Sequence, residues 1–457
     1  MNTTIAAIST AVSASGIGII RISGPEAMDI ISRIYRSKGG KKKIKEVPTH
    51  TIHYGYIYDG KEVVDEVLVM VMRAPKTFTG EDTVEIDCHG GVYAMNRVLE
   101  TVLKNGAKIA GPGEFTKRAF LNGRLDLSQA EAVMDVIQAK NEYALKSSMS
   151  QLKGSVQKTI KEIRDELLYE IAFIESALDD PEHISLDGYP QKLQGIVEKE
   201  QKSIEELLKT SADGKIIREG IKTVIVGKPN AGKSSLLNLL VGENKAIVTD
   251  IEGTTRDILE EYITLHGITL KIVDTAGIRE TEDVVEKIGV TRAREAAKDA
   301  DLILYVVDSS TPLDENDEEI IELLEGRKAI VLYNKTDLAP AVDQKELERK
   351  IGHPVIPVSA KEETGVTQLA DTIREMFFSG KISFNDEVYI TNARHKEALE
   401  EALQSLEMVM RSIEDGMPED FFSIDLMAAY ASLGKITGEE VGEDLVNEIF
   451  AKFCMGK

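Results

Sequence analysis

A glycine-rich motif near the middle of the chain constrains its fold more than any other feature. The segment Gly227-Lys-Pro-Asn-Ala-Gly-Lys-Ser234 fits the pattern G-x-x-x-x-G-K-[ST], in which backbone N–H groups surround the phosphates of a nucleotide. An apolar run at 221–226 precedes the motif, and a helical pattern at 234–240 follows it. This order of strand, loop and helix is typical of a mostly parallel sheet with crossover helices. The motif therefore predicts a nucleoside triphosphate site at the end of a strand.

Three further motifs follow in the order expected of a guanine nucleotide site. They are Asp274-Thr-Ala-Gly277, Asn334-Lys-Thr-Asp337 and Ser359-Ala-Lys361. The Asp337 carboxylate can accept hydrogen bonds from both the ring N–H and the exocyclic amine of guanine, a donor pair that adenine lacks. A chance match to one motif is easy, but a match to four in order is not. The sequence therefore predicts a GTP-binding protein.

The expected GTP-binding residues divide by the part of the ligand that each contacts. Lys233 supplies positive charge to the β- and γ-phosphates, and the Ser234 hydroxyl is the expected Mg²⁺ ligand. Thr255 lies in a segment that resembles a first switch loop and is the candidate for a second hydroxyl on Mg²⁺. Asp274 is expected to hold the metal through water, and Gly277 to sense the γ-phosphate. The full set is Asn230, Ala231, Gly232, Lys233, Ser234, Ser235, Thr249, Asp250, Ile251, Glu252, Gly253, Thr254, Thr255, Asp274, Thr275, Ala276, Gly277, Asn334, Lys335, Thr336, Asp337, Ser359, Ala360 and Lys361.

One position departs from the pattern of small signalling GTPases. Those proteins carry a Gln after the D-x-x-G motif, where it orients the attacking water. Here the residue is Ile278, which cannot form a hydrogen bond. Water positioning and charge neutralisation must therefore come from other groups. The nearby candidates, each of which could equally be a solvated surface residue, are Arg256, Arg279, Glu282 and Glu286.

The rest of the chain divides into an α+β segment and two helical segments that flank the nucleotide motifs. Short β-rich runs and helical stretches alternate through the first 118 residues. Apolar residues from Leu152 to Leu178 recur every three or four positions, which predicts one face of a long helix, and helical periodicity resumes near Asn392. The sequence thus predicts an N-terminal domain at 1–118, helical segments at 119–215 and 381–457, and a G domain at 216–380 inserted between them. Two separate helical domains are the alternative.

Composition narrows the classes of partner. A formal net charge of −23 argues against a general electrostatic hold on nucleic acid, so an RNA contact must use a local patch or a partner. The lysine run at 38–45 is a candidate patch or simply a solvated loop. Two cysteines, Cys88 and Cys454, imply no disulfide framework, and Cys88 lies in a strand-like run typical of a core. With no apolar run of about 18 residues and no basic segment before the first apolar stretch, we expect a cytoplasmic protein with no membrane segment.

Together these motifs resemble the MnmE or TrmE family of tRNA modification GTPases. The phosphate loop with Pro229-Asn230, the segment 249–257 and the terminal Cys454-Met-Gly-Lys457 carry the resemblance. N-terminal matches extend it to nearly the full length, at 18–24, 78–82, 89–91, 111–115 and 121–127. The resemblance implies a Ras-like P-loop GTPase domain inserted into an all-helical domain, preceded by an α+β tetrahydrofolate-binding-like domain.

For the GTP site, the resemblance implies a K⁺-dependent GTPase whose G domains pair across a homodimer. A set of oxygen ligands can replace the hydration shell of the ion, which then neutralises charge that develops on the phosphates. Glu286 would orient the attacking water, and Arg279 is a further catalytic candidate. The implied K⁺ ligands are Asn230, Thr249, Ile251 and Thr254.

The resemblance also implies a site for 5-formyl-tetrahydrofolate or a related one-carbon tetrahydrofolate. Its implied contacts are Arg21, Glu81, Arg124 and Lys457, and position 124 is often Lys in the family. A carboxylate suits the donor edge of a pterin, and cations suit the glutamate tail. Cys454, in the family's C-x-G-K ending, would be a catalytic thiol near the folate; a packed terminal cysteine is the alternative.

In function, the resemblance implies a homodimer that acts with the FAD-dependent MnmG (GidA) protein in a heterotetramer-like complex. Together they would install a carboxymethylaminomethyl or aminomethyl group on C5 of the wobble uridine of certain tRNAs, with carbon from the folate. Two alternatives stay open at this point. One is a ribosome-assembly GTPase, and the other is a folate-binding regulatory GTPase without RNA chemistry.

Overall fold

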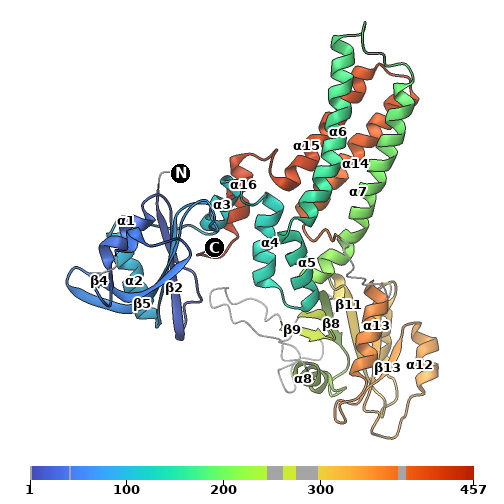
Figure 1. Ribbon diagram of the computed structural model, residues 1–457. Coiled ribbons are helices and arrows are strands. Elements are labelled where there is room, and N and C mark those ends of the chain that lie inside the picture. The colour runs from blue at the N-terminus through green and yellow to red at the C-terminus, as the bar shows by residue number, and fades with distance from the viewer. Residues whose placement is uncertain (1–2, 41–42, 244–260, 274–296, 379–387, 457) are drawn as a thin grey trace. The chain divides into compact units, whose positions relative to one another are not determined.

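The computed structural model describes the chain except for residues 1–2, 41–42, 244–260, 274–296, 379–387 and 457 (Figure 1). The chain forms two compact units. The first comprises Met1–Met134, Gln151–Val197 and Glu401–Lys457, and the second comprises Asp135–Ser150 and Glu198–Glu400. The domain boundaries expected at 118, 215 and 380 remain predictions.

The N-terminal part of the first unit is a seven-stranded sheet of order β3-β4-β5-β6-β2-β1-β7, antiparallel except for the pair β1–β7. In β5, Val67, Val69 and Val71 are buried and Leu68 is exposed, the alternation of a sheet with one covered face. Helices α1 (Ala27–Ile34) and α2 (Val92–Lys104) pack on that face. The strands are β1 Ile5–Ile8, β2 Ser15–Ser23, β3 Tyr35–Ser37, β4 Thr51–Asp59, β5 Glu62–Met72, β6 Thr83–Gly90 and β7 Lys108–Ile109.

Helices make up the rest of the first unit. Helix α6 (Ser155–Asp179) packs against α15 (Glu419–Thr437), as Figure 1 shows. The other helices with residues in this unit are α3 Glu114–Leu121, α4 Leu127–Gln138, α5 Glu142–Leu152, α7 Tyr189–Glu219, α14 Ala393–Glu414 and α16 Glu443–Ala451.

The long-helix prediction needs a correction at each end. The face from Val156 to Ile174 is buried on α6 as expected, but Leu152 belongs to the preceding helix, α5. The chain breaks between them at Gly154, whose φ of +92° favours glycine and caps α6. At the other end, Leu178 is 43% exposed, so it is not part of the buried face.

The second unit contains a six-stranded sheet of order β13-β12-β11-β8-β10-β9, parallel except for the antiparallel pair β9–β10. These elements confirm the predicted pattern of a mostly parallel sheet with crossover helices. The strands are β8 Ile221–Val226, β9 Glu261–Leu265, β10 Ile268–Val273, β11 Leu302–Asp308, β12 Ala329–Asn334 and β13 Val355–Pro357. The helices are α8 Lys233–Glu243, α11 Glu315–Leu324, α12 Gln344–Ile351 and α13 Val366–Phe378.

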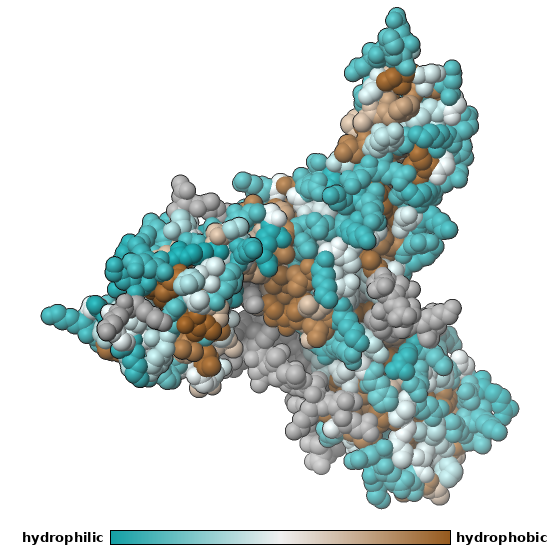
Figure 2. Space-filling view, in the orientation of Figure 1, coloured by the Kyte–Doolittle hydropathy of each residue, from teal (hydrophilic) through white to brown (hydrophobic). Residues whose placement is uncertain are grey.

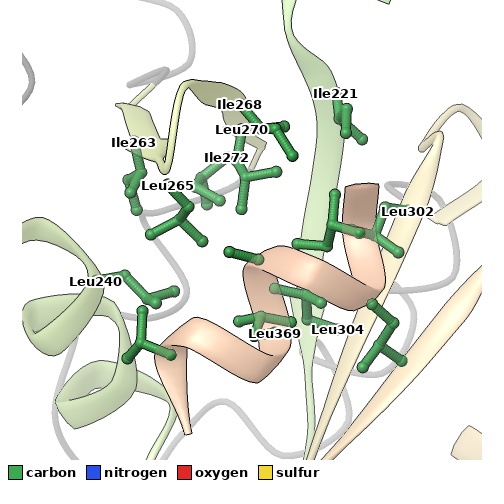
Figure 3. Packing of buried hydrophobic residues seen from close by; sticks show 14 of the residues in the cluster. Ile221, Leu240, Ile263, Leu265, Ile268, Leu270, Ile272, Leu302, Leu304 and Leu369 are labelled. Atoms are coloured by element: carbon green, nitrogen blue, oxygen red, sulfur yellow. The ribbon is translucent and has the colours of Figure 1, made fainter. Parts of the chain in front are cut away.

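Both faces of this sheet are covered, which explains why its strands are continuous apolar runs. Helices α8 and α13 pack on one face, and α11 and α12 on the other. Figure 3 shows the first of these cores, where side chains of the sheet and of α13 converge. The labelled residues are Ile221, Leu240, Ile263, Leu265, Ile268, Leu270, Ile272, Leu302, Leu304 and Leu369.

The start of α5 is attached to the β9–β10 hairpin within the second unit. The Asn141 Nδ2 donates to the Thr269 Oγ1 at 2.7 Å, and its Oδ1 accepts from the Ala144 N–H at 2.7 Å. The ring of Tyr143 lies against Gly267, where a Cβ would come within 2.6 Å of the ring. Helix and hairpin therefore share polar and steric contacts.

The surface seen in Figure 2 is largely hydrophilic over α6 and α7, in keeping with the formal net charge of −23. Among the described helices, none combines the length and apolarity that a membrane span requires.

Candidate functional site

The loop from Gly227 to Lys233 joins β8 to α8 at the C-terminal end of a parallel strand, where α/β folds bind their ligands. Gly227 has φ +152° and lies so close to β11 that a Cβ would be 2.5 Å from the Val306 carbonyl oxygen. Gly232 has φ +99°, and its Cβ would be 2.2 Å from the Asn334 Nδ2. Both glycines are required by backbone conformation and by close approach. The loop therefore has the bare backbone that a phosphate-binding loop needs.

Lys233 begins α8, so its ammonium lies at the N-terminus of a helix that favours anions. Its Nζ donates to the carbonyl oxygens of Gly227 and Lys228, both at 2.7 Å. Burial lowers the pKa of this ammonium. Ser234 and Ser235 are exposed on the first helical turn, and Asn230 is exposed on the loop with φ +59°. An ammonium and two hydroxyl side chains thus lie on the first turn of one helix, an arrangement that suits phosphates and Mg²⁺.

Asn334 joins the phosphate loop to the base-recognition loops. It ends β12, is 1% exposed, and donates from Nδ2 to the Ala231 carbonyl oxygen at 2.9 Å. Its Oδ1 accepts from the Ala360 N–H at 3.4 Å. Because both the NH₂ group and the oxygen of this buried amide are hydrogen-bonded, Asn334 links the phosphate loop, the N-K-x-D motif and the S-A-K motif.

Asp337 is fixed by the neighbouring motif. One carboxylate oxygen accepts from the Ser359 Oγ at 3.0 Å, and the other lies 3.8 Å from the Lys361 Nζ. The Asp337 side chain is 11% exposed and that of Lys361 is 81% exposed. The structure thus brings together the N-K-x-D and S-A-K motifs, as the sequence predicted, and orients the carboxylate expected to read guanine.

Lys335 adopts φ +63°, and its Nζ donates to Asp308 at 2.6 Å. Burial acts in the opposite direction, but hydrogen bonds from Lys335 and Ser310 hold the pKa of Asp308 below its ordinary value. Thr336 donates from Oγ1 to the Val358 carbonyl oxygen at 3.1 Å. The whole N-K-x-D segment is therefore anchored by its own side chains.

Sequence analysis missed the buried support of the phosphate loop. The Lys228 Nζ lies 2.7 Å from Asp317 and 3.0 Å from Asp314, and the Tyr305 hydroxyl donates to Asp317 at 2.7 Å. Burial opposes this charge, yet the two carboxylates raise the pKa of Lys228. Asp314 and Asp317 also form a capping box at the start of α11. That local D-x-x-D pattern is the one signal that could have revealed them.

Several expected residues lie outside the described part of the chain. They are Thr249, Asp250, Ile251, Glu252, Gly253, Thr254, Thr255, Arg256, Asp274, Thr275, Ala276, Gly277, Arg279, Glu282, Glu286 and Lys457. Their roles toward Mg²⁺, K⁺, the attacking water and the folate stay predictions.

A second cluster of expected residues lies in the first unit around the ring of Phe78. The guanidinium carbon of Arg21 is 5.9 Å from this ring's centroid, and that of Arg124 is 5.1 Å from it. Arg21 also donates from Nε to Glu85 at 2.7 Å and stacks at 5.6 Å over Phe115. Two cations thus flank one aromatic ring.

A third expected residue of the N-terminal domain, Glu81, contacts buried polar side chains. Its Oε2 accepts from the Ser23 Oγ at 2.8 Å and from the Arg118 Nη1 at 3.1 Å. Arg118 was not predicted to matter, because nothing in its local sequence marks it.

The C-terminal segment contacts the N-terminal domain. The Gly456 carbonyl oxygen accepts from the Ser9 Oγ at 3.1 Å and lies 3.5 Å from the Arg21 Nη1. Gly456 has φ +84°, and a Cβ there would be 2.2 Å from the Ile8 carbonyl oxygen. The Gly113 N–H donates to the Cys454 carbonyl oxygen at 3.3 Å, and the Cys454 side chain is exposed. The described part of the C-x-G-K segment, residues 454–456, is therefore held against the N-terminal domain, with Gly456 beside Arg21.

Comparisons with known proteins cover nearly the whole chain. The MnmE helical-domain family profile matches residues 127–454, and the profile described as the GTP-binding protein TrmE N-terminus matches residues 4–124. A tRNA modification GTPase MnmE of Lachnoclostridium phytofermentans is 58% identical over 99% of each chain. The protein of the same name from Geobacillus kaustophilus is 51% identical, again over 99% of each chain. The G domain of the T. maritima FeoB iron transporter is 30% identical over 34% of this chain and 97% of its own, with a TM-score of 0.27 that supports no structural conclusion.

The order of the motifs, the observed domains and the full-length similarity all indicate the same family. The chain belongs to the MnmE family of tRNA modification GTPases and is a GTP hydrolase.

Proposed function

We propose that this GTPase is K⁺-dependent and acts as a homodimer with an FAD-dependent MnmG (GidA) protein in a heterotetramer-like complex. The pair modifies C5 of the wobble uridine of certain tRNAs, adding a carboxymethylaminomethyl or aminomethyl group whose one-carbon unit comes from 5-formyl-tetrahydrofolate or a related folate. The observation that most supports the proposal is that two groups of residues with different chemistry belong to different compact units. The phosphate loop and Asp337 belong to the second unit, and the cluster of Arg21, Glu81 and Arg124 belongs to the first.

In the GTP site, the donor set fits Mg²⁺ and K⁺. Ser234 and Thr255 supply the hydroxyl oxygens that Mg²⁺ prefers. Asn230 supplies an amide oxygen for K⁺, together with oxygens of Thr249, Ile251 and Thr254. Bound K⁺ would supply positive charge where the phosphates develop negative charge. Ile278 cannot orient the attacking water as a Gln would, and Glu286 and Arg279 are the candidate catalytic residues.

The K⁺ proposal is tested by GTP turnover in KCl and in NaCl at equal ionic strength. Because a cation at this position replaces an arginine finger, we expect at least about tenfold faster turnover in KCl. Asn230→Ala should remove most of this difference, whereas Asn238→Ala, an exposed amide on α8, should leave it intact. Equal rates of the wild type in the two salts would refute K⁺ dependence.

In the N-terminal domain, the charges fit a folate. The Glu81 carboxylate can accept from the N–H groups of a pterin, and Arg21 and Arg124 suit a carboxylate tail. Cys454 is a candidate thiol beside this cluster, and Lys457 a further cation. Calorimetric binding of 5-formyl-tetrahydrofolate should weaken in Glu81→Ala; unchanged affinity argues against the pocket.

The RNA chemistry is tested by mass spectrometry of tRNA nucleosides from a strain that lacks this protein. We expect the C5 group to be missing from wobble uridines and to return when the wild-type chain is restored. Unaltered wobble uridines in the deletion strain would remove the proposal.

A further inference from the structure

A buried arginine, Arg118, forms an ion pair with Glu81. Arg118 is in α3, and its side chain is 1% exposed, whereas that of Glu81 is 13% exposed. Burying a guanidinium costs several kcal/mol unless it is paired and hydrogen-bonded. The folded protein can therefore bury this guanidinium only if its partners offset the loss of hydration.

The partners of Arg118 are Thr3 and Glu81, which are distant in the sequence, and Glu114, one turn earlier on the same helix. Its Nη1 donates to the Thr3 carbonyl oxygen at 2.7 Å and lies 3.2 and 3.1 Å from the two oxygens of Glu81. Its Nη2 donates to Glu114 at 2.9 Å and to the Thr3 Oγ1 at 3.3 Å. Among the described residues, its Nε has no hydrogen-bond partner. Arg118 is thus held by the N-terminal segment and by a second carboxylate.

Glu114 is itself fixed, because its Oε2 accepts from the Gly111 N–H at 2.8 Å. On the other side of Glu81, Ser23 donates to Oε2 at 2.8 Å, and Ser23 is 2.7 Å from the Thr79 Oγ1. Arg118 and Ser23 therefore hold the Glu81 carboxylate on its buried side. A ligand can contact the exposed part of Glu81 but not the buried Arg118.

We propose that Arg118 is a positioning residue that holds the Glu81 carboxylate in the orientation needed for a ligand with paired N–H donors, the chemistry of an amino-substituted pterin. The proposal rests on the proposed function, which places a tetrahydrofolate at Glu81. Without Arg118, the Glu81 carboxylate would lose its contacts to a guanidinium at 3.2 and 3.1 Å, and of the side-chain contacts described above only the hydrogen bond from Ser23 would remain. Its oxygens could then turn away from the N–H donors of the ligand.

The test is calorimetric binding of 5-formyl-tetrahydrofolate to the full-length protein. Arg118→Met should weaken binding by about tenfold to a hundredfold, the range for a lost hydrogen bond to a charged group. Arg118→Lys should recover part of this loss because it keeps the charge. Arg97→Met is the matched control, since Arg97 pairs with Asp59 and Glu62 elsewhere in the same domain, and it should bind as the wild type does.

The Glu81→Gln background separates positioning from a purely structural role. If Arg118 acts through Glu81, the double variant Glu81→Gln with Arg118→Met binds no more weakly than Glu81→Gln alone. A further loss in the double variant, or wild-type affinity of Arg118→Met, would overturn the proposal. Should Arg118→Met fail to fold, Arg118→Lys replaces it, with a several-fold loss expected only when Glu81 is present.

Failure of the underlying function gives a different result. If the wild type does not bind the folate, the folate pocket itself is refuted, and the positioning role falls with it. If the wild type binds and Arg118→Met binds equally well, only the positioning role is refuted.

Discussion

Replacement of Asp337 by Asn is the sharpest test of how the chain selects guanine. The Asp337 carboxylate accepts from Ser359 at 3.0 Å and is 11% exposed, so its orientation is set before the nucleotide arrives. Guanine offers two N–H donors to this carboxylate. Two charge-assisted hydrogen bonds at about 1.5–3 kcal/mol each total about 3–6 kcal/mol, or roughly 10²–10⁴ in affinity. The amide side chain of the Asp337→Asn variant would keep one acceptor oxygen, but its NH₂ group would face an N–H donor of guanine. Most of this roughly 10²–10⁴ in affinity should therefore be lost.

Xanthine has a carbonyl at the position of the exocyclic amine of guanine, and that oxygen can accept from the Asn amide. Asp337→Asn should therefore prefer xanthosine diphosphate to GDP, whereas the wild type prefers GDP. Dissociation constants for both nucleotides, from calorimetry, measure the reversal. Asp343→Asn is the control, because Asp343 only caps α12 by accepting from the Glu346 N–H at 2.9 Å. If Asp337→Asn binds GDP as tightly as Asp343→Asn does, the assigned role of Asp337 is wrong.

Two further predictions follow from the described geometry. Gly232→Ala should abolish measurable nucleotide binding, because its Cβ would lie 2.2 Å from the Asn334 Nδ2 at φ +99°. By contrast, Gly242→Ala, in open space on α8, should keep nucleotide affinity and raise the free energy of unfolding by up to about 1 kcal/mol in urea titrations. Burial raises the pKa of the Cys88 thiol to about 12, so at pH 8 iodoacetamide should add one group to the folded protein, on the exposed Cys454. Intact mass and peptide mapping check this, and a modified Cys88 in folded protein would contradict it.

The G domain could be predicted in detail because its signals are local. Each glycine and each strand of the nucleotide site lies within a few residues of the motif that reveals it, and the strands are continuous apolar runs bounded by those motifs. The spacing of Asn334 and Asp337 alone indicated the base. What the sequence did not show is that the buried Asn334 amide bonds to Ala231, 103 positions earlier in the chain.

The N-terminal cluster could be predicted only in part. Resemblance to a family singled out Arg21 and Glu81, but not the arginine behind Glu81. Two partners of Arg118, Thr3 and Glu81, lie 115 and 37 positions away, and neither separation leaves a periodic or compositional trace. The third, Glu114, is an i,i+4 neighbour, and such pairs are common on exposed helix surfaces. The break at Gly154 was missed for the opposite reason, because apolar spacing continues across it while the backbone turns.

The attachment of Asn141 and Tyr143 to the β9–β10 hairpin has a mechanical consequence. The hydrogen bond of Asn141 to Thr269 joins residues that lie 128 positions apart in the chain, and Tyr143 packs on Gly267 beside it. Both sides of this attachment belong to the second compact unit, so it stiffens that unit from within. A shift of the hairpin must therefore either move the start of α5 or break a 2.7 Å hydrogen bond.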